Sequence, residues 1–379
     1  IMSSDWSSDV CSSDLEAARA ALAGDALYAA LRVDGRAAVQ RYLEERPRYA
    51  TPAVWVLDRA VHLVARDGSR VELVHTIARL GTEEAIERHG ELGVPANAVL
   101  LTARTIQADG QVLEPEAIPN KPTFSLPDLA PGDFVEAEYA VYHPPSPLFP
   151  GGFDTDRFYF QSSDAAFHRS ELVVVAPADL ALQLDPRGAA PAPVERRLED
   201  RRVLTWRARE VRPRAPEPLS PALAELLPST RVAAAASPEA LTGRLREMLA
   251  ELRRPSPHVD ALAAEILAGV PEEDPAARRR ALYHWVLENV EQSGDLFEQA
   301  SHVLTRRSGD RTRALEALLA AAGTPARLAI VSPAGADRHT GSIPTLAHLD
   351  RRALLVEPDE WISLEQDGAP YGFLPPDLR

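Results

Sequence analysis

The sequence contains almost no cysteine or lysine and has no long apolar run. Its only cysteine is Cys11 and its only lysine is Lys121, so arginine carries nearly all of the basic charge. A single cysteine excludes an intrachain disulfide framework and a cysteine-rich zinc site. No stretch approaches the roughly 18 consecutive apolar residues that a membrane-spanning helix needs, so we expect no transmembrane segment in this chain.

An excess of basic charge is also lacking. The formal net charge is −15 at pH 7, and a protein that neutralises phosphates needs a basic surface, so we predict that the chain binds neither nucleic acid nor anionic lipid. The sequence has no glycine-rich phosphate loop, and its histidines show no metal-ligand spacing, so we expect no cofactor and no metal. The 379 residues and the hydrophobic content of 45% suit two globular domains.

The first fifteen residues differ from the rest of the chain. They contain the tripeptide Ser-Ser-Asp three times and do not resemble a signal peptide. The segment from Asp9 to Leu15 can be back-translated into a common sequencing adapter, so we interpret residues 1–15 as a disordered assembly artefact; the alternative is a polar, disordered tail. Because Cys11 lies in this stretch, the remaining chain offers no thiol for catalysis, a disulfide or a metal.

The following residues change from a helical to a strand-like periodicity. Residues 16–48 carry apolar side chains at helical spacing and predict short helices, a possible remnant of an upstream helical region. From Val54 onward, short β-rich runs alternate with turn dipeptides such as Asp67-Gly68. Many short strands at this spacing predict an antiparallel β-sandwich over residues 50–210.

A second domain is expected after a segment rich in proline and alanine. Residues 211–240 are typical of a linker, and residues 241–379 predict an α+β domain. Asp274-Pro275 is a helix start, and a further helix is expected to begin near Asp310. Strands are expected at Leu328–Val331, Ala353–Glu357 and Trp361–Leu364.

The order of motifs in this second domain resembles the transglutaminase-like superfamily, whose fold is papain-like. The matching motifs are Ala281–Val286, Ala300–Arg311, Leu315–Arg327, Ala347–Asp350 and Tyr371–Pro376. The preceding sandwich is similar to a domain of unknown function that often precedes this domain in bacterial proteins. The resemblance covers roughly residues 50–379 and implies an α+β protein, an N-terminal β-sandwich followed by a papain-like domain, located in the bacterial periplasm or cell envelope.

The catalytic positions of that family are degenerate here. The resemblance implies a Cys-His-Asp triad, in which histidine deprotonates the thiol and aspartate orients the imidazole. Arg311 occupies the nucleophile position, His348 the histidine position and Ser363 the acid position. Arginine has no nucleophilic atom at working pH, and a serine hydroxyl does not balance an imidazolium charge, so the triad is not intact.

Arg311 and His348 each have two interpretations. Arg311 can be an anchor that binds a carboxylate or an extended peptide, or it can form a structural ion pair with an acid such as Asp310 or Glu357. His348 can contact a ligand or can simply be hydrogen-bonded in place. One base change converts a cysteine codon to arginine, whereas aspartate to serine takes two. Two losses at one site therefore favour genuine degeneration over a sequencing error.

These features predict a pseudoenzyme. Its expected role is to bind a protein or peptide, or to act as a scaffold, in the bacterial envelope. The alternative is an active cysteine transglutaminase or protease of the same fold, if Arg311 is a sequencing error. A third hypothesis is that both domains are spacers in a longer multidomain chain.

Overall fold

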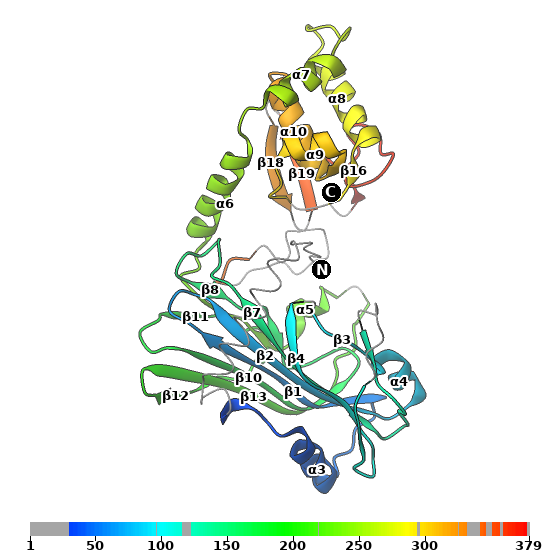
Figure 1. Ribbon diagram of the computed structural model, residues 1–379, viewed down its shortest axis with the longest axis vertical. Coiled ribbons are helices and arrows are strands. Elements are labelled where there is room, and N and C mark those ends of the chain that lie inside the picture. The colour runs from blue at the N-terminus through cyan, green and yellow to red at the C-terminus, as the bar shows by residue number, and fades with distance from the viewer. Residues whose placement is uncertain are drawn as a thin grey trace. The chain divides into compact units, whose positions relative to one another are not determined.

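The structure is a computed structural model that describes residues 30–95, 97–115, 123–218, 220–293, 296–324, 326–331, 342–345, 351–356 and 359–376. It is mixed α and β, and the chain divides between Ser237 and Pro238 into two compact units, the N-terminal unit and the C-terminal unit (Figure 1). The predicted artefact at residues 1–15 and the predicted helical residues up to 29 lie outside the described residues.

The N-terminal unit is built on one eight-stranded sheet. Its two longest strands, Ala53–Val64 and Ala166–Pro177, are buried along nearly their whole length, as expected for strands that are covered on both faces. In spatial order the strands are β12 (Val194–Leu198), β13 (Arg201–Val211), β10 (Ala166–Pro177), β1 (Ala53–Val64), β2 (Arg70–Leu80), β7 (Phe134–His143), β4 (Ala98–Ile106) and β5 (Val112–Leu113).

The sheet is mixed, which corrects the sequence-based expectation of an antiparallel arrangement. Strands β1 and β10 are parallel neighbours, with Arg59 opposite Glu171, whereas the other neighbouring pairs of this sheet are antiparallel. The chain forms β2 to β9 before it returns as β10. Parallel neighbours require such a long crossover, and no local turn signal reports it.

The two faces of the sheet bury different partners. One face shares a core with the small sheet β11 (Leu182–Leu184), β15 (Val232–Ala234) and β8 (Phe153–Asp154), in which Trp206 and Phe153 are almost fully buried. The opposite face receives helix α3 (Gly35–Glu45), which packs Val39 and Tyr42 against β1 and its neighbours (Figure 1). The helix begins at Asp34, whose side chain accepts hydrogen bonds from two backbone amides.

Short elements complete the N-terminal unit. They are α4 (Glu83–His89), β3 (Glu91–Gly93), β6 (Thr123–Ser125), β9 (Phe158–Tyr159), α5 (Leu223–Leu226) and β14 (Ser229–Thr230). Strands β14 and β15 fall within residues 211–240, for which a linker was expected, and they pair with β9, β8 and β11. Their short run of buried β-branched and small side chains lies after the prolines that suggested a linker.

The C-terminal unit combines helices with a three-stranded sheet. Its helices are α6 (Pro238–Leu252), α7 (Pro257–Ile266), α8 (Pro275–Asn289), α9 (Ala300–Arg306) and α10 (Arg311–Ala321). The sheet has the order β18 (Ala326–Val331), β19 (Arg351–Val356) and β20 (Glu360–Ile362), and β16 (Glu291–Gln292) pairs with β17 (Ser308–Gly309).

Helix α10 forms the centre of this unit. Leu315, Leu318 and Leu319 have no exposed surface and belong to the core that α7, α8 and the sheet share. The predicted start of α8 is confirmed, because the Asp274 side chain accepts from the Ala277 amide at 2.8 Å and Pro275 occupies the first turn. Most of the α10 surface is buried, so its N-terminus is held in a fixed position.

His62, buried on β1, gives the N-terminal unit a pH-dependent stability. Burial lowers the pKa of His62 from 6.5 to about 4, although Glu72 opposes the shift. The folded state therefore keeps His62 neutral, and its contribution is complete above pH 6.5 and is lost as the pH falls towards 4. We expect the stability of the wild type relative to His62→Gln to shrink by about 3 kcal/mol across that window.

The comparison between variants is needed because a second group titrates in the same range. Burial raises the pKa of Asp58 to about 6, so Asp58 has the opposite effect on stability between those pH values. Urea unfolding at several pH values measures the difference. His258→Gln, at a histidine that is exposed, supplies a control for the substitution itself. A constant difference for His62→Gln would contradict the prediction.

Candidate functional site

Helix α10 begins at Arg311, the residue that the sequence assigns to the nucleophile position. Strand β17 leads into it through Gly309, whose φ of 140° and close approach to Val303 leave no room for a side chain, since a Cβ would lie 2.7 Å from Val303 Cγ2. Asp310 follows as the N-cap and is completely buried. One of its oxygens accepts from the Arg313 amide at 2.8 Å, and the other forms an ion pair with Arg352 on β19.

Arg311 is the first residue of the helix, and its guanidinium is held by several partners. Its Nε donates to the Val290 carbonyl at 2.6 Å, its Nη2 lies 3.4 Å from the Leu287 carbonyl, and its Nη1 forms an ion pair with Asp367. Only 7% of Arg311 is exposed. The side chain therefore joins the end of α8 and the loop after β20 to the start of α10.

The ion pair of Arg311 differs from the two partners suggested by the sequence. Asp310 is engaged by Arg352, and Glu357 lies outside the described residues. Asp367, which supplies the carboxylate, is itself largely exposed. The carboxylates of Asp310 and Asp367 place two negative charges near a helix N-terminus that would otherwise carry an unfavourable cation.

Ser363 lies immediately after β20 and is also buried. Its hydroxyl is 3.5 Å from the Glu365 amide, and its carbonyl oxygen accepts from the Tyr283 hydroxyl at 3.4 Å. Tyr283 also donates to the Ala369 carbonyl at 3.0 Å. Burial raises the pKa of Tyr283 while the positive charge of Arg311 opposes that shift. Arg311 and Ser363 thus both lie near Tyr283, whereas His348 lies outside the described residues.

A second polar group on α10 was missed by the sequence analysis. Arg313 is 1% exposed and forms an ion pair with Glu316, one helical turn further on. Glu316 is bound in turn by Arg253, at 2.6 Å, from the segment between α6 and α7. Burial lowers the pKa of Arg313, and Glu316 opposes the shift. The Arg313–Glu316 spacing is visible in the sequence, but nothing there indicates that the pair is buried.

This group lines a cavity of about 710 Å³ within the C-terminal unit. Charged side chains and small apolar side chains share its surface. Its lining includes Arg253, Arg254, Arg313 and Glu316, and a row of alanines at positions 300, 317, 320, 321 and 326. Cavities of this size hold small ligands or a few residues of a peptide.

Two searches of the described part of the chain were negative. No three histidine, cysteine, aspartate or glutamate side chains there lie close enough together to hold a metal ion. None of the helices among these residues has the length and apolar character needed to cross a membrane.

Comparisons with known proteins found similarity to a protein family and to a solved structure. A family described as a domain of unknown function with a solved structure, DUF3857, matches residues 121–215, about a quarter of the chain. The structure is similar to the crystal structure of a candidate protease from Parabacteroides distasonis, with a TM-score of 0.66 and 17% sequence identity. That match covers 84% of this chain and 68% of that chain. At this identity the similarity shows the fold.

Two further comparisons give no support for a relationship to another known protein. Aminopeptidase A of Legionella pneumophila, solved in complex with aspartic acid, aligns with 51% of this chain and 22% of its own at 10% identity. Its TM-score is 0.29. No curated protein matches the chain.

Proposed function

We propose that the C-terminal unit is a transglutaminase-like domain of papain-like arrangement that has no thiol chemistry and binds a peptide. In this proposal the eight-stranded sheet and the β11–β15–β8 sheet of the N-terminal unit form a β-sandwich, and the protein acts in the bacterial envelope, as the family resemblance implies. The observation that carries the proposal is the state of Arg311, which stands at the start of α10 with its guanidinium bound to Val290, Leu287 and Asp367.

The contacts of Arg311 argue against covalent catalysis at this position. A nucleophile must be free to attack and must be activated by a base, whereas a guanidinium stays protonated and has no lone pair to offer. Its donors also stabilise the junction of α8, α10 and the loop after β20. Of the two interpretations of Arg311, its contacts favour the structural ion pair. The roles of Arg311 and His348 as ligand contacts remain predictions.

The cavity beside α10 is the place where we expect a peptide to bind. Arg254 is exposed and Arg253 is half-exposed at its edge, and arginine forks bind carboxylates such as an acidic side chain or a C-terminus. The alanines that also line the cavity leave space for the apolar side chains of the ligand. This arrangement supports an acidic, partly apolar peptide.

A matched pair of tryptophan variants tests the proposal. Ala320 lines the cavity and is exposed, whereas Ala264 is exposed on α7 and does not line it. The purified chain should bind a subset of an array of short random-sequence peptides. Ala320→Trp should weaken the binding of those peptides at least about tenfold, a loss of about 1.4 kcal/mol, because the new ring fills the cavity. Ala264→Trp should bind them as the wild type does.

Two outcomes would contradict the proposal. Equal binding by both tryptophan variants would place the peptide elsewhere, and an array without any bound peptide would favour the spacer hypothesis. The enzyme alternative has its own readout, which is amine incorporation or peptide cleavage that iodoacetamide blocks. The similarity of the fold to a candidate protease makes that assay worth including, and positive thiol-dependent turnover would exclude a non-catalytic protein.

A further inference from the structure

Strand β12 forms one edge of the eight-stranded sheet in the N-terminal unit (Figure 1). It pairs with β13 on one side, and among the residues that the structure describes no strand pairs with its other side. All five residues of β12 are exposed. A row of free backbone donors and acceptors at a sheet edge is a template for a further strand, so the open side of β12 can accept one.

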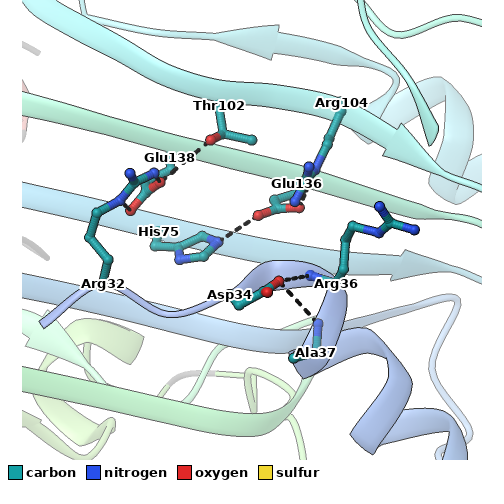
Figure 2. A network of polar contacts seen from close by, with 9 residues as sticks. All are labelled: Arg32, Asp34, Arg36, Ala37, His75, Thr102, Arg104, Glu136 and Glu138. Carbon is teal, nitrogen blue, oxygen red and sulfur yellow. Dashed lines mark hydrogen bonds and ion pairs between the residues drawn. The ribbon is translucent and has the colours of Figure 1, made fainter. Parts of the chain in front are cut away.

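The charged side chains in the middle of the sheet already have partners. Glu136 accepts from His75 Nε2 at 3.0 Å and from Arg104 Nε at 2.7 Å, as Figure 2 shows. Strand β12 differs, because Arg196 and Arg197 have no carboxylate partner within the described part of the chain. The edge therefore offers unpaired side-chain charge as well as unpaired backbone groups.

The register of the β12–β13 hairpin determines which backbone groups face the open edge. Leu198 and Arg201 are directly opposite each other across a two-residue turn, and such a pair exchanges both of its backbone hydrogen bonds within the hairpin. Pairs in an antiparallel ladder alternate between bonded and non-bonded positions. Glu195 and Arg197 occupy the non-bonded positions, so their N–H and C=O groups point away from β13 towards the open edge.

The turn of the hairpin holds this edge in place. Glu199 has a φ of 54°, a left-handed conformation that is typical of tight hairpin turns. The carbonyl of Asp200 accepts from the amide of Ala178, just after β10, at 2.8 Å. The turn is thus tied to the third strand of the sheet, and a partner strand would meet a preformed edge that costs little conformational entropy to order.

We propose that the open edge of β12 binds the same edge of a second copy of this chain, with the two β12 strands antiparallel about a two-fold axis at Arg196. In this register Glu195 of each copy stands opposite Arg197 of the other, and these two pairs exchange the free backbone hydrogen bonds. Val194 of each copy stands opposite Leu198 of the other. The surface belongs to the N-terminal unit and is independent of the cavity beside α10.

The side chains of β12 favour a second copy as the occupant. Charged residues on an edge strand ordinarily prevent pairing, because like charges would meet. Here Glu195 meets Arg197, and the large apolar side chains Val194 and Leu198, which are 56% and 45% exposed, meet each other. Opposite charges and apolar pairs placed directly across two strands both stabilise a sheet. Only Arg196 meets its own copy, and that contact weakens the association.

The carboxylate of Glu195 has an oxygen left for this pairing. Its Oε2 accepts from Arg202 Nη2 on β13 at 2.9 Å, which leaves Oε1 for Arg197 of the second copy. A register shifted by two residues would instead set Glu195 against Glu195 or Arg197 against Arg197. The charges therefore select the register whose two-fold axis lies at Arg196.

Reversal of single charges tests this pairing. In sedimentation velocity over a concentration series, the wild-type chain should show a reversible equilibrium between monomer and dimer. Glu195→Arg sets arginine against Arg197 of the second copy, and Arg197→Glu sets glutamate against Glu195. Each change should weaken dimerisation at least about tenfold. Glu87→Arg, which makes the same change of charge at an exposed position of α4, should dimerise as the wild type does.

A mixture of the two single variants identifies the register. Between Glu195→Arg in one copy and Arg197→Glu in the other, both cross-strand pairs again have opposite charges, so the mixture should dimerise although neither variant does so alone. This recovery also shows that both variants fold. A mixture without dimers, or single variants that dimerise like the wild type, would overturn the proposal. A wild-type chain that stays monomeric would also overturn it and would leave the edge to a strand of another protein.

Amide hydrogen exchange measured by NMR gives a backbone readout. The amides of Glu195 and Arg197 should exchange slowly where the dimer predominates and fast after dilution, whereas the Arg196 amide, bonded within the hairpin, should be slow in both samples. Arg196→Thr should tighten the dimer about threefold, because it removes the contact between like charges. Equal exchange of the Glu195 and Arg197 amides in both samples would overturn the proposal, even for a chain that dimerises.

Discussion

Replacing Asp310 by alanine should destabilise the C-terminal unit by about 3–5 kcal/mol, because the change removes one member of a buried ion pair. Asp310 has no exposed surface, and its carboxylate binds both Arg352 and the Arg313 amide. Alanine would leave Arg352 without its carboxylate and would remove the cap of α10, the helix that forms the centre of the unit. Loss of the cap alone accounts for about 1 kcal/mol.

Asparagine at the same position separates the two contributions. Asp310→Asn keeps an oxygen that accepts from the Arg313 amide but cannot pair with Arg352, so it should be more stable than the alanine variant by about 1 kcal/mol. Hydrogen exchange followed by mass spectrometry measures both variants, since it reports the protection of α10 separately from that of the N-terminal unit. A loss below about 1 kcal/mol for alanine would mean that the ion pair with Arg352 contributes little.

The second large effect is expected for Glu136→Ala in the N-terminal unit, again about 3–5 kcal/mol. Glu136 is 2% exposed and binds His75 and Arg104. Its removal would leave those two groups without a carboxylate in the middle of the sheet. The carboxylate also lies against the first residue of α3, where a Cβ on Gly35 would come within 1.9 Å of Glu136 Oε1.

An exposed ion pair of the same unit is the matched control. Arg66 and Asp179 pair at 2.7 Å, but their side chains are 65% and 68% exposed. Asp179→Ala should therefore leave the free energy of unfolding almost unchanged. Hydrogen exchange followed by mass spectrometry of peptides from the N-terminal unit measures both variants. A similar loss of stability in Glu136→Ala and Asp179→Ala would show that burial does not decide the effect.

Local chemistry explains the parts of the fold that could be predicted. Asp274-Pro275 and Asp310 start helices because a short polar side chain satisfies the first free amides, and these interactions involve residues only three positions apart. The strands β18, β19 and β20 likewise follow from runs of β-branched and apolar residues. The sequence also shows that the chain after Cys11 contains no thiol.

Long-range pairing explains what could not be predicted. The parallel contact of β1 with β10 joins Arg59 to a glutamate 112 positions away, and the pairing of Arg311 with Asp367 spans 56 positions. An ion pair of this kind depends on register and burial, and both are decided only when the elements pack. The residue types at the candidate sites are thus written in the sequence, whereas tertiary structure alone decided which charges are paired and which are buried.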